Sequence, residues 1–284
     1  MGQGLHKVKR RIQTVDSTRK ITSSMKLVSS VKFSKLQKVY ENRLEFHDAL
    51  KDFGNDLFTE AKLRPQYRKY FEGPEGAKKN LYVVVTSSMG LCGSYKHNVQ
   101  KYLESVYKEG DDIILIGTSL LSFLTREGNI DVNTDFINMS ETLSMASARI
   151  LAKEVFKRYS TNKYKKISLI YTHYINVISY EVKEFSLLPL EFKESKESYA
   201  HEGLYEPSFE YIFERFIKKH ITLSLYMKIF DSNLSEQSSR RNAMDNADKN
   251  AKELIDKLTL EYNKARQASI TQEITEVVAG SANK

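Results

Sequence analysis

Apolar side chains recur every three or four residues at both ends of the chain, which is the spacing of one face of an α-helix. The N-terminal stripe consists of Leu5, Val8, Ile12, Val15, Ile21, Met25, Val28, Leu36, Val39, Phe46, Leu50, Phe53 and Leu57. The C-terminal stripe consists of Phe209, Ile212, Phe216, Leu223, Met227, Phe230 and Leu234, and, after a polar gap, Met244, Ala247, Ala251, Leu254, Leu258, Tyr262 and Ala265. The pattern therefore predicts one long amphipathic helix at each end.

Residues that break helices are scarce in both segments. All four prolines lie between Pro65 and Pro207, Gly54 is the only glycine from residue 5 to 64, and none occurs from 204 to 279. Unbroken helices of this extent would be about 80–110 Å long, which is too long for a small globule to bury. We therefore expect each helix to cover the apolar stripe of the other in an antiparallel two-stranded coiled coil. A bundle of shorter, broken helices is the alternative, and the lack of Gly and Pro disfavours it.

The middle of the chain has a different pattern. "NLYVVVTSS" and "DDIILIGTS" are short β-branched runs followed by turn residues, as expected of buried parallel strands, and "KKISLIYTHYI" and "SYEVKEFSLLPL" are further strand candidates. "HNVQKYLESVYKEG" and "ETLSMASARILAKEVFKRYS" have helical spacing between them. The alternation predicts a central α/β, Rossmann-like domain. The expected division is a helix over residues 1–64, the α/β domain over 76–201 and a second helix over 207–284.

Charge and cysteine content narrow the possible partners. Of the net charge of +8, +7 comes from the first 50 residues, which contain 11 Lys and Arg against 4 Asp and Glu. Such a basic block binds nucleic acid, an acidic membrane surface or an acidic protein groove, although a solvated helix face is commoner. The single cysteine, Cys92, forms no internal disulfide and fits a reducing compartment. No run approaches the ~20 apolar residues of a membrane span, so any membrane association is expected to go through a partner.

The candidate chemistry of the α/β domain is weak. "TSSMGLCGSY", residues 86–95, follows a strand and precedes a helix, but it contains only G-x-x-G and lacks the complete dinucleotide or P-loop patterns. A tight turn is the favoured interpretation over a nucleotide site. Cys92 and His173 have no triad or metal-ligand spacing around them, and packing roles are expected for both. We predict no catalytic, cofactor-binding or metal-binding residue.

Both terminal segments resemble a known family. "KRRIQTVDSTRKITSSMKLVSSVKFSKLQ", residues 9–37, and "LSEQSSRRNAMDNADKNAKELIDKLTLEYNKARQASITQEITEVVAGSA", residues 234–282, are similar to the first and last helices of the γ subunit of F-type ATP synthases. "GLCGSY" resembles that family's central loop. The resemblance implies a non-catalytic rotor shaft that turns inside an α3β3 ring, with the ε subunit and the c-ring at its foot. It also implies no cofactor and a peripheral location on the cytoplasmic face of the membrane, in a bacterium because no transit peptide is evident.

The resemblance also implies positions that contact partners. They are Arg10, Arg11, Met25, Lys26, Arg240, Gln267, Thr271, Ile274, Val277 and Val278. Alignment of the two helices at their inner ends leaves roughly twenty residues of the last helix without a partner from this chain, or about 30 Å. That overhang keeps an apolar stripe and carries only Glu273 and Glu276 as charges between residues 268 and 283. We expect an apolar sleeve from the ring to surround it.

Two other features bear on the partners. "SEQSSRRN", residues 235–242, is polar on every side, which favours contact with a polar collar of the ring. Met89, Ser94 and Lys96 depart from the family's usual Arg, Gly and Asn around the central loop. Ser29 and Ser30 replace the usual alanines. These departures affect expectations about the foot most.

Four other functions compete with the rotor shaft of an ATP synthase. The basic first helix suggests a coiled coil that binds nucleic acid, but the chain has no Trp and no basic patch interleaved with aromatic residues. An enzyme built on the α/β domain would need specific ligand binding by residues 76–201. A structural scaffold, or the shaft of an F1-like ATPase that drives another load, also fits the helices. The scaffold leaves the overhang unexplained.

Overall fold

The computed structural model describes residues 2–126, 130–192 and 205–282. Side chains at residues 2, 3, 42–48, 51 and 279–282 are not described. Contacts divide the chain into two compact units. One combines the chain up to Val31 with the chain from Arg240 onward, and we call it the shaft unit; the other, Lys32–Ser239, we call the body. Both long helices contribute to both units.

Two helices dominate the structure. Helix α1 spans Gly2–Lys62 and helix α5 spans Phe209–Ala282. Helix α1 ends shortly before Pro65, the first residue of the 3-10 helix η1 (Pro65–Tyr70). Proline disfavours helical backbone at the residue before it, which explains this boundary. Helix α5 begins after Pro207, and the Ser208 hydroxyl accepts a hydrogen bond from the Tyr211 backbone N–H at 3.3 Å, as a helix N-cap does.

The body is built on a five-stranded sheet with the order β3-β2-β1-β4-β5. Its strands are β1 (Lys79–Val85), β2 (Asp112–Ile116), β3 (Val132–Asn133), β4 (Tyr164–Tyr174) and β5 (Tyr180–Leu188). Strands β3, β2, β1 and β4 are parallel, and β5 is antiparallel to β4. The helices between them are α2 (Tyr95–Val106), α3 (Leu121–Arg126) and α4 (Met145–Tyr159).

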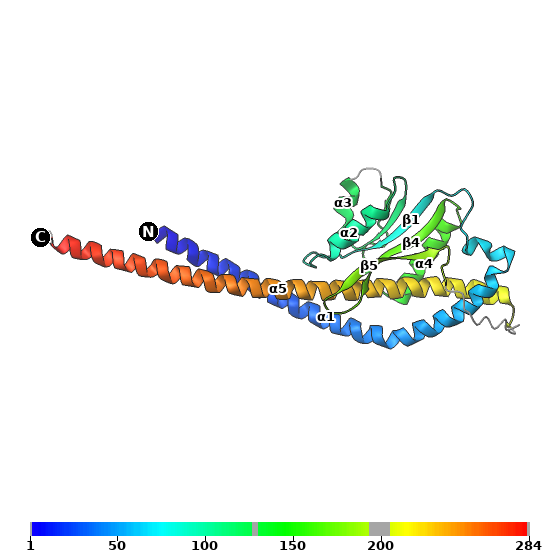
Figure 1. Cartoon of the computed structure of the whole chain (residues 1–284), viewed down its shortest axis with the longest axis horizontal. Coiled ribbons are helices and arrows are strands. Elements are labelled where there is room, and N and C mark those ends of the chain that lie inside the picture. Colours follow the sequence, from blue (N-terminus) through cyan, green and yellow to red (C-terminus); the bar gives the residue numbers. More distant parts are fainter. Residues whose placement is uncertain (1, 127–129, 193–204, 283–284) are drawn as a thin grey trace. The chain divides into compact units, whose positions relative to one another are not determined.

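Alternate residues of β1 supply two apolar cores, one on each face of the sheet. Leu81, Val83 and Val85 pack in the core that includes α4 and the body's parts of α1 and α5. Tyr82 and Val84 pack in the core that includes α2 and α3. This is the period-2 alternation of a strand that is buried on both faces. Figure 1 shows α2 and α3 on one side of the sheet, and α4 and α5 on the other. The predicted α/β, Rossmann-like class with long helices is confirmed.

Aromatic side chains hold the end of α1 against the start of α5. The ring of Phe213 lies 4.3 Å from that of Tyr67 and 6.4 Å from that of Phe58, measured between centroids. Gly54 lies at this contact, because a Cβ there would come within 3.1 Å of the Phe216 ring. A larger residue would require the Phe216 ring to shift by a few tenths of an ångström, so the close contact of the two helices is suited to a glycine at this position.

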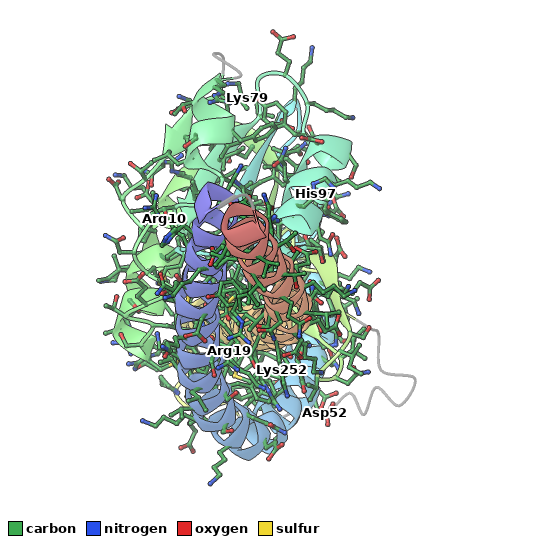
Figure 2. All side chains as sticks on the ribbon, turned by 90° about the vertical axis from the view of Figure 1, so that its left-hand side faces the viewer. Arg10, Arg19, Asp52, Lys79, His97 and Lys252 are labelled. Carbon is green, nitrogen blue, oxygen red and sulfur yellow. The ribbon has the colours of Figure 1, made fainter. Side chains whose placement is uncertain are left out.

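In the shaft unit the two helices lie side by side and antiparallel (Figures 1 and 2). Lys26 Nζ of α1 lies 2.5 Å from Asp245 Oδ1 of α5. Met244 and Leu258 of α5 are buried in the same unit. The inward positions of α1 include Leu5, Val8, Ile12 and Val15, in agreement with the pattern.

The predicted stripe is wrong further along α1. Ile21 and Val28 are 61% and 57% exposed, whereas Thr22 and Ser29 lie on the inward face and Ser29 is 2% exposed. Helix periodicity places residues on a common face but does not say which face the partner helix covers. In this part of α1 the apolar residues therefore face away from α5.

Candidate functional site

The outward side of α1 in the shaft unit carries an apolar stripe. Its members are Ile21, Leu27, Val28 and Val31, each more than half exposed. At 100° per residue they fall within about 120° of one another, opposite the face that holds Thr22 and Ser29. The exposed Lys20 lies on the same side. An apolar stripe beside a cationic residue is suited to a partner surface with apolar and acidic side chains.

Of the predicted contact residues on α1, Arg10 and Arg11 are exposed, and Met25 and Lys26 are half-buried. Figure 2 labels Arg10 on this helix, and the structure gives Arg10 no ion pair among the described contacts. Lys26 is held in the ion pair with Asp245, whose other oxygen lies 2.7 Å from Lys249 Nζ. Hydrogen bonds from Lys249 and Lys26 lower the pKa of Asp245 to about 2. Lys26 therefore stabilises the helix pair itself.

The last turns of α5 form a second exposed apolar stripe. Ile270, Ile274, Val277 and Val278 are 47%, 59%, 72% and 60% exposed. Polar side chains around them bond within their own helix: the Thr271 hydroxyl donates to the Gln267 carbonyl at 3.0 Å, and Gln272 donates to Glu276. These turns thus present aliphatic side chains with few unsatisfied polar groups among them. The structure brings Gln267, Thr271, Ile274, Val277 and Val278 together on one exposed segment.

The polar stretch of α5, residues 235–242, is not the exposed surface that a contact with a polar collar of the ring would need. The side chains of Ser235, Glu236, Ser238 and Ser239 are all buried. The Ser238 hydroxyl donates to the Val177 carbonyl at 2.8 Å, and the Ser239 hydroxyl donates to the Cys92 carbonyl at 2.6 Å. The hydroxyl groups of Ser238 and Ser239 therefore serve as hydrogen-bond donors to the α/β domain of the same chain. Arg240 is 5% exposed and interacts within the chain, so little of its side chain is accessible to a partner.

The loop at the end of β1 is a tight turn. Gly93 has φ 59° and Leu91 has φ 62°, both in the left-handed region. The Cys92 thiol is 3% exposed and lies 3.5 Å from the Ser87 hydroxyl. His173 Nδ1 lies 2.7 Å from Asp231 Oδ2, and His173 is part of no metal-ligating group among the described residues. None of these side chains forms a nucleophile, base and oxyanion-hole arrangement.

Two features were missed at the level of sequence. The outward stripe of α1 has a signal, because Ile21 and Val28 are seven residues apart while small polar residues occupy the inward positions. The hydrogen bonds from α5 to the α/β domain had no signal in the sequence, since they join serine hydroxyl groups to backbone atoms that a sequence does not distinguish.

Among the helices that the structure describes, none combines the length and the apolar composition of a membrane-spanning segment.

Comparisons with known proteins agree with this geometry. A family model described as ATP synthase matches residues 4–283. The chain is 34% identical to the ATP synthase gamma chain of Mycoplasmoides gallisepticum, with 97% of this chain and 98% of that relative covered. It is also 34% identical to the gamma chain of Clostridium kluyveri, with coverage of 99% and 98%.

Solved structures show the same fold. The rotor of the Euglena gracilis mitochondrial ATP synthase matches with a TM-score of 0.68 at 20% identity, over 95% of this chain and all of that chain. The central stalk and c-ring structure of Tetrahymena thermophila mitochondrial ATP synthase contains a chain that matches with a TM-score of 0.59 at 26% identity. That match covers 80% of this chain and 99% of the other.

Proposed function

The chain belongs to the ATP synthase gamma chain family, and on that premise we propose that it is the central rotor shaft of a rotary ATP synthase. One observation carries this proposal: the last turns of α5 expose four aliphatic side chains, 47–72% accessible, on a helix that is otherwise paired or buried. Exposed apolar surface of this kind marks a contact with another molecule. A sleeve formed by a ring of catalytic subunits would cover it.

The division of labour follows the three predicted segments. The segments 1–64 and 207–284 act as the shaft, and the α/β domain over residues 76–201 acts as the foot. The shaft stands in an α3β3 ring, and the foot joins an ε subunit and a c-ring. The Euglena structures of the rotor and of an assembly of OSCP, F1 and c-ring, and the Tetrahymena structure of a central stalk and c-ring, support the catalytic ring and the c-ring as partners.

The contacts with the ring are assigned to exposed residues. Arg10 and Arg11 supply positive charge to acidic loops of the ring, where charge guides association without rigid packing. Met25 lies close to the outward stripe and meets the moving part of the catalytic subunits. Ile274, Val277 and Val278 contact the apolar sleeve, with Gln267 and Thr271 near its entrance. Lys26 and Arg240 contribute less than the resemblance implies, because both are engaged within the chain.

The chain itself is not an enzyme under this proposal, and the nucleotides belong to its partners. It associates with the cytoplasmic face of a bacterial membrane through the foot. Coupling arises because the shaft is asymmetric: one side of α1 is apolar and the opposite side is covered by α5. Each catalytic site then meets a different surface as the shaft turns, which shifts that site between conformations by differential contact.

Reconstitution with α and β subunits tests the proposal. Cys92 is buried, so a bead is attached through a cysteine introduced at the exposed Lys101 of α2. We expect stepwise rotation on addition of ATP and an ATP hydrolysis rate above that of the ring alone. A second bead position, a cysteine introduced at the exposed Lys153 of α4, serves as the control for the position at Lys101. Assembly with both handles stationary would contradict a rotor and favour a static scaffold, and a failure to assemble would contradict the ring partner.

A further inference from the structure

Helix α5 replaces a missing strand partner at the edge of β4. Strand β1 pairs with β4 only as far as Ile170, whereas β4 continues to Tyr174 with β5 on its other edge. Beyond Ile170 the edge that faced β1 has no strand beside it, and backbone groups there need other hydrogen-bonding partners when they are buried. Side chains of α5 bond to these groups.

The bonds follow the geometry of the strand. The Thr172 N–H donates to the Ser232 hydroxyl at 2.8 Å, and the Thr172 carbonyl accepts from the Ser235 hydroxyl at 3.2 Å. The Tyr174 N–H donates to Asp231 Oδ1 at 2.9 Å. Residues 172 and 174 direct their backbone groups to the same edge because a strand alternates with period 2. Three side chains within little more than one helical turn thus act as the hydrogen-bonding partner of the strand.

The same helix also holds three loops of the body. Ser238 bonds to the Val177 carbonyl in the β4–β5 turn, and Ser239 bonds to the Cys92 carbonyl in the β1–α2 loop. Asn233 donates to the Ser140 carbonyl at 2.9 Å, in the segment before α4. We call the α5 residues Asp231, Ser232, Asn233, Ser235, Ser238 and Ser239 the polar seam.

The polar seam differs from ordinary core packing because it is directional. Apolar contacts tolerate small rotations of a helix about its axis, whereas side-chain hydrogen bonds to fixed backbone atoms weaken steeply when their geometry changes. Ser232 and Ser235 are fully buried, and Asp231 is 2% exposed and further held by His173. Water cannot easily replace these bonds at such positions.

We propose that the polar seam fixes the rotational position of α5 on the α/β domain and is thereby the element that transmits torque between foot and shaft. This inference rests on the rotor function proposed above. The six residues are positioning residues, since their side chains bond to other parts of the same chain. They end at Ser239, one residue before the shaft unit begins, which is where a load applied to the foot must enter the helix.

A local test uses hydrogen exchange of the full chain. Ser232→Ala removes the acceptor of the Thr172 N–H, so exchange at that amide should accelerate about 5–10-fold, the usual effect of one lost buried hydrogen bond. Exchange of the Ile114 amide in β2 should not change. Asp231→Asn keeps an acceptor for the Tyr174 N–H and places an amide beside His173 Nδ1, so the Tyr174 amide should stay protected. Asp231→Ala should expose it. Unchanged exchange in Ser232→Ala and Asp231→Ala would overturn the assignment of these bonds.

The functional test measures coupling in the complete membrane complex. The triple variant Ser232→Ala, Ser238→Ala, Ser239→Ala should assemble and hydrolyse ATP at close to the wild-type rate, while ions pumped per ATP hydrolysed should fall. The torsional stiffness measured with a bead on the α/β domain should fall with it. Ser105→Ala is the matched control, because its exposed hydroxyl bonds only within α2.

A second control separates torque transmission from simple stability. Leu103→Ala destabilises the α/β domain in the core that contains no α5 residue, and it should leave the pumping ratio and the stiffness unchanged. Equal losses in Leu103→Ala and the triple variant would overturn the proposal, as would an unchanged ratio in the triple variant. If the triple variant does not fold, Ser238→Ala alone carries the same test. A wild-type complex that neither assembles nor hydrolyses ATP would instead overturn the rotor function.

Discussion

The two halves of helix α5 make opposite use of the same secondary structure. Residues 221–239 include no exposed position, since the body covers this part of the helix on every side. From residue 263 to 278 only Ser269 is partly buried, and aliphatic side chains are exposed. An α-helix supplies its own backbone hydrogen bonds, so it can pass from one environment to the other without a break. The buried contacts of the first half stabilise the isolated chain, and the exposed side chains of the second half can contact a partner.

The largest effect on stability is expected from the buried half. Phe213→Ala removes a fully buried ring that packs against Tyr67, Phe58 and Phe209. It should lower the free energy of unfolding by about 3–5 kcal/mol. Urea unfolding of the isolated chain measures this change. Tyr211→Ala, at a position that is 47% exposed, should cost well under half as much. Equal costs would remove the contrast between buried and exposed sides of the helix.

The exposed half should behave in the opposite way. The double variant Ile274→Asp, Val278→Asp should leave the free energy of unfolding within about 0.5 kcal/mol of wild type, because both positions are solvated in the isolated chain. Affinity for the α3β3 ring should fall at least about tenfold, because a sleeve would have to bury two carboxylates. A ring pull-down titration gives the affinity. Thr275→Asp places one charge on another face and should lose less, and a larger loss there would contradict the stripe.

The outward stripe of α1 should give a smaller effect of the same kind. Ile21→Ser with Val28→Ser should keep the thermal midpoint of the isolated chain, while ATP hydrolysis stimulated by the shaft should fall about 2–10-fold through lost apolar contact. Phe33→Ala is the contrasting change, because Phe33 is 3% exposed and packs against Tyr174 in the body. It should lower the midpoint instead. If both variants changed only the midpoint, the stripe would be a structural face.

The smallest effect concerns pH and the pairing of helices in the shaft unit. Because Lys249 and Lys26 lower the pKa of Asp245 to about 2, its stabilising contribution is present above the unfolded pKa near 4 and is lost as the pH falls through about 2. Asp245→Asn should therefore melt slightly below wild type at pH 7 and together with it near pH 2. Calorimetry at both values checks this. A difference that grew at low pH would have the wrong sign.

The hydrophobic pattern correctly predicted the strands and helices whose apolar residues are buried by other residues of the same chain. The short β-branched apolar runs and the long segments without Gly or Pro predicted the strands, the helices and the fold class, because local pattern and global burial agree there. The two-residue strand β3 and the short helix α3 were not predicted, since such elements carry too few residues to show a period. Element bounds differed by a few residues.

The remaining errors share a physical cause. Ile21 and Val28 were assigned to the paired face because an apolar residue signals burial without identifying the surface that buries it. Ser238 and Ser239 were assigned to a partner because a hydroxyl signals a hydrogen bond without identifying the acceptor. Under our proposal the surface that covers Ile21 and Val28 belongs to another subunit. The acceptors of Ser238 and Ser239 are backbone carbonyl groups far away in the sequence.

The antiparallel pairing of α1 with α5 also determines when the shaft unit can form during synthesis. Lys26 and its partner Asp245 are separated by the whole α/β domain. At about 5–20 residues per second, a ribosome needs roughly 10–45 s to make the intervening chain. For that time the inward face of α1 has no α5 to cover it. We therefore expect the nascent chain to depend on a chaperone or on an early partner subunit for a time that is set by the length of the inserted domain.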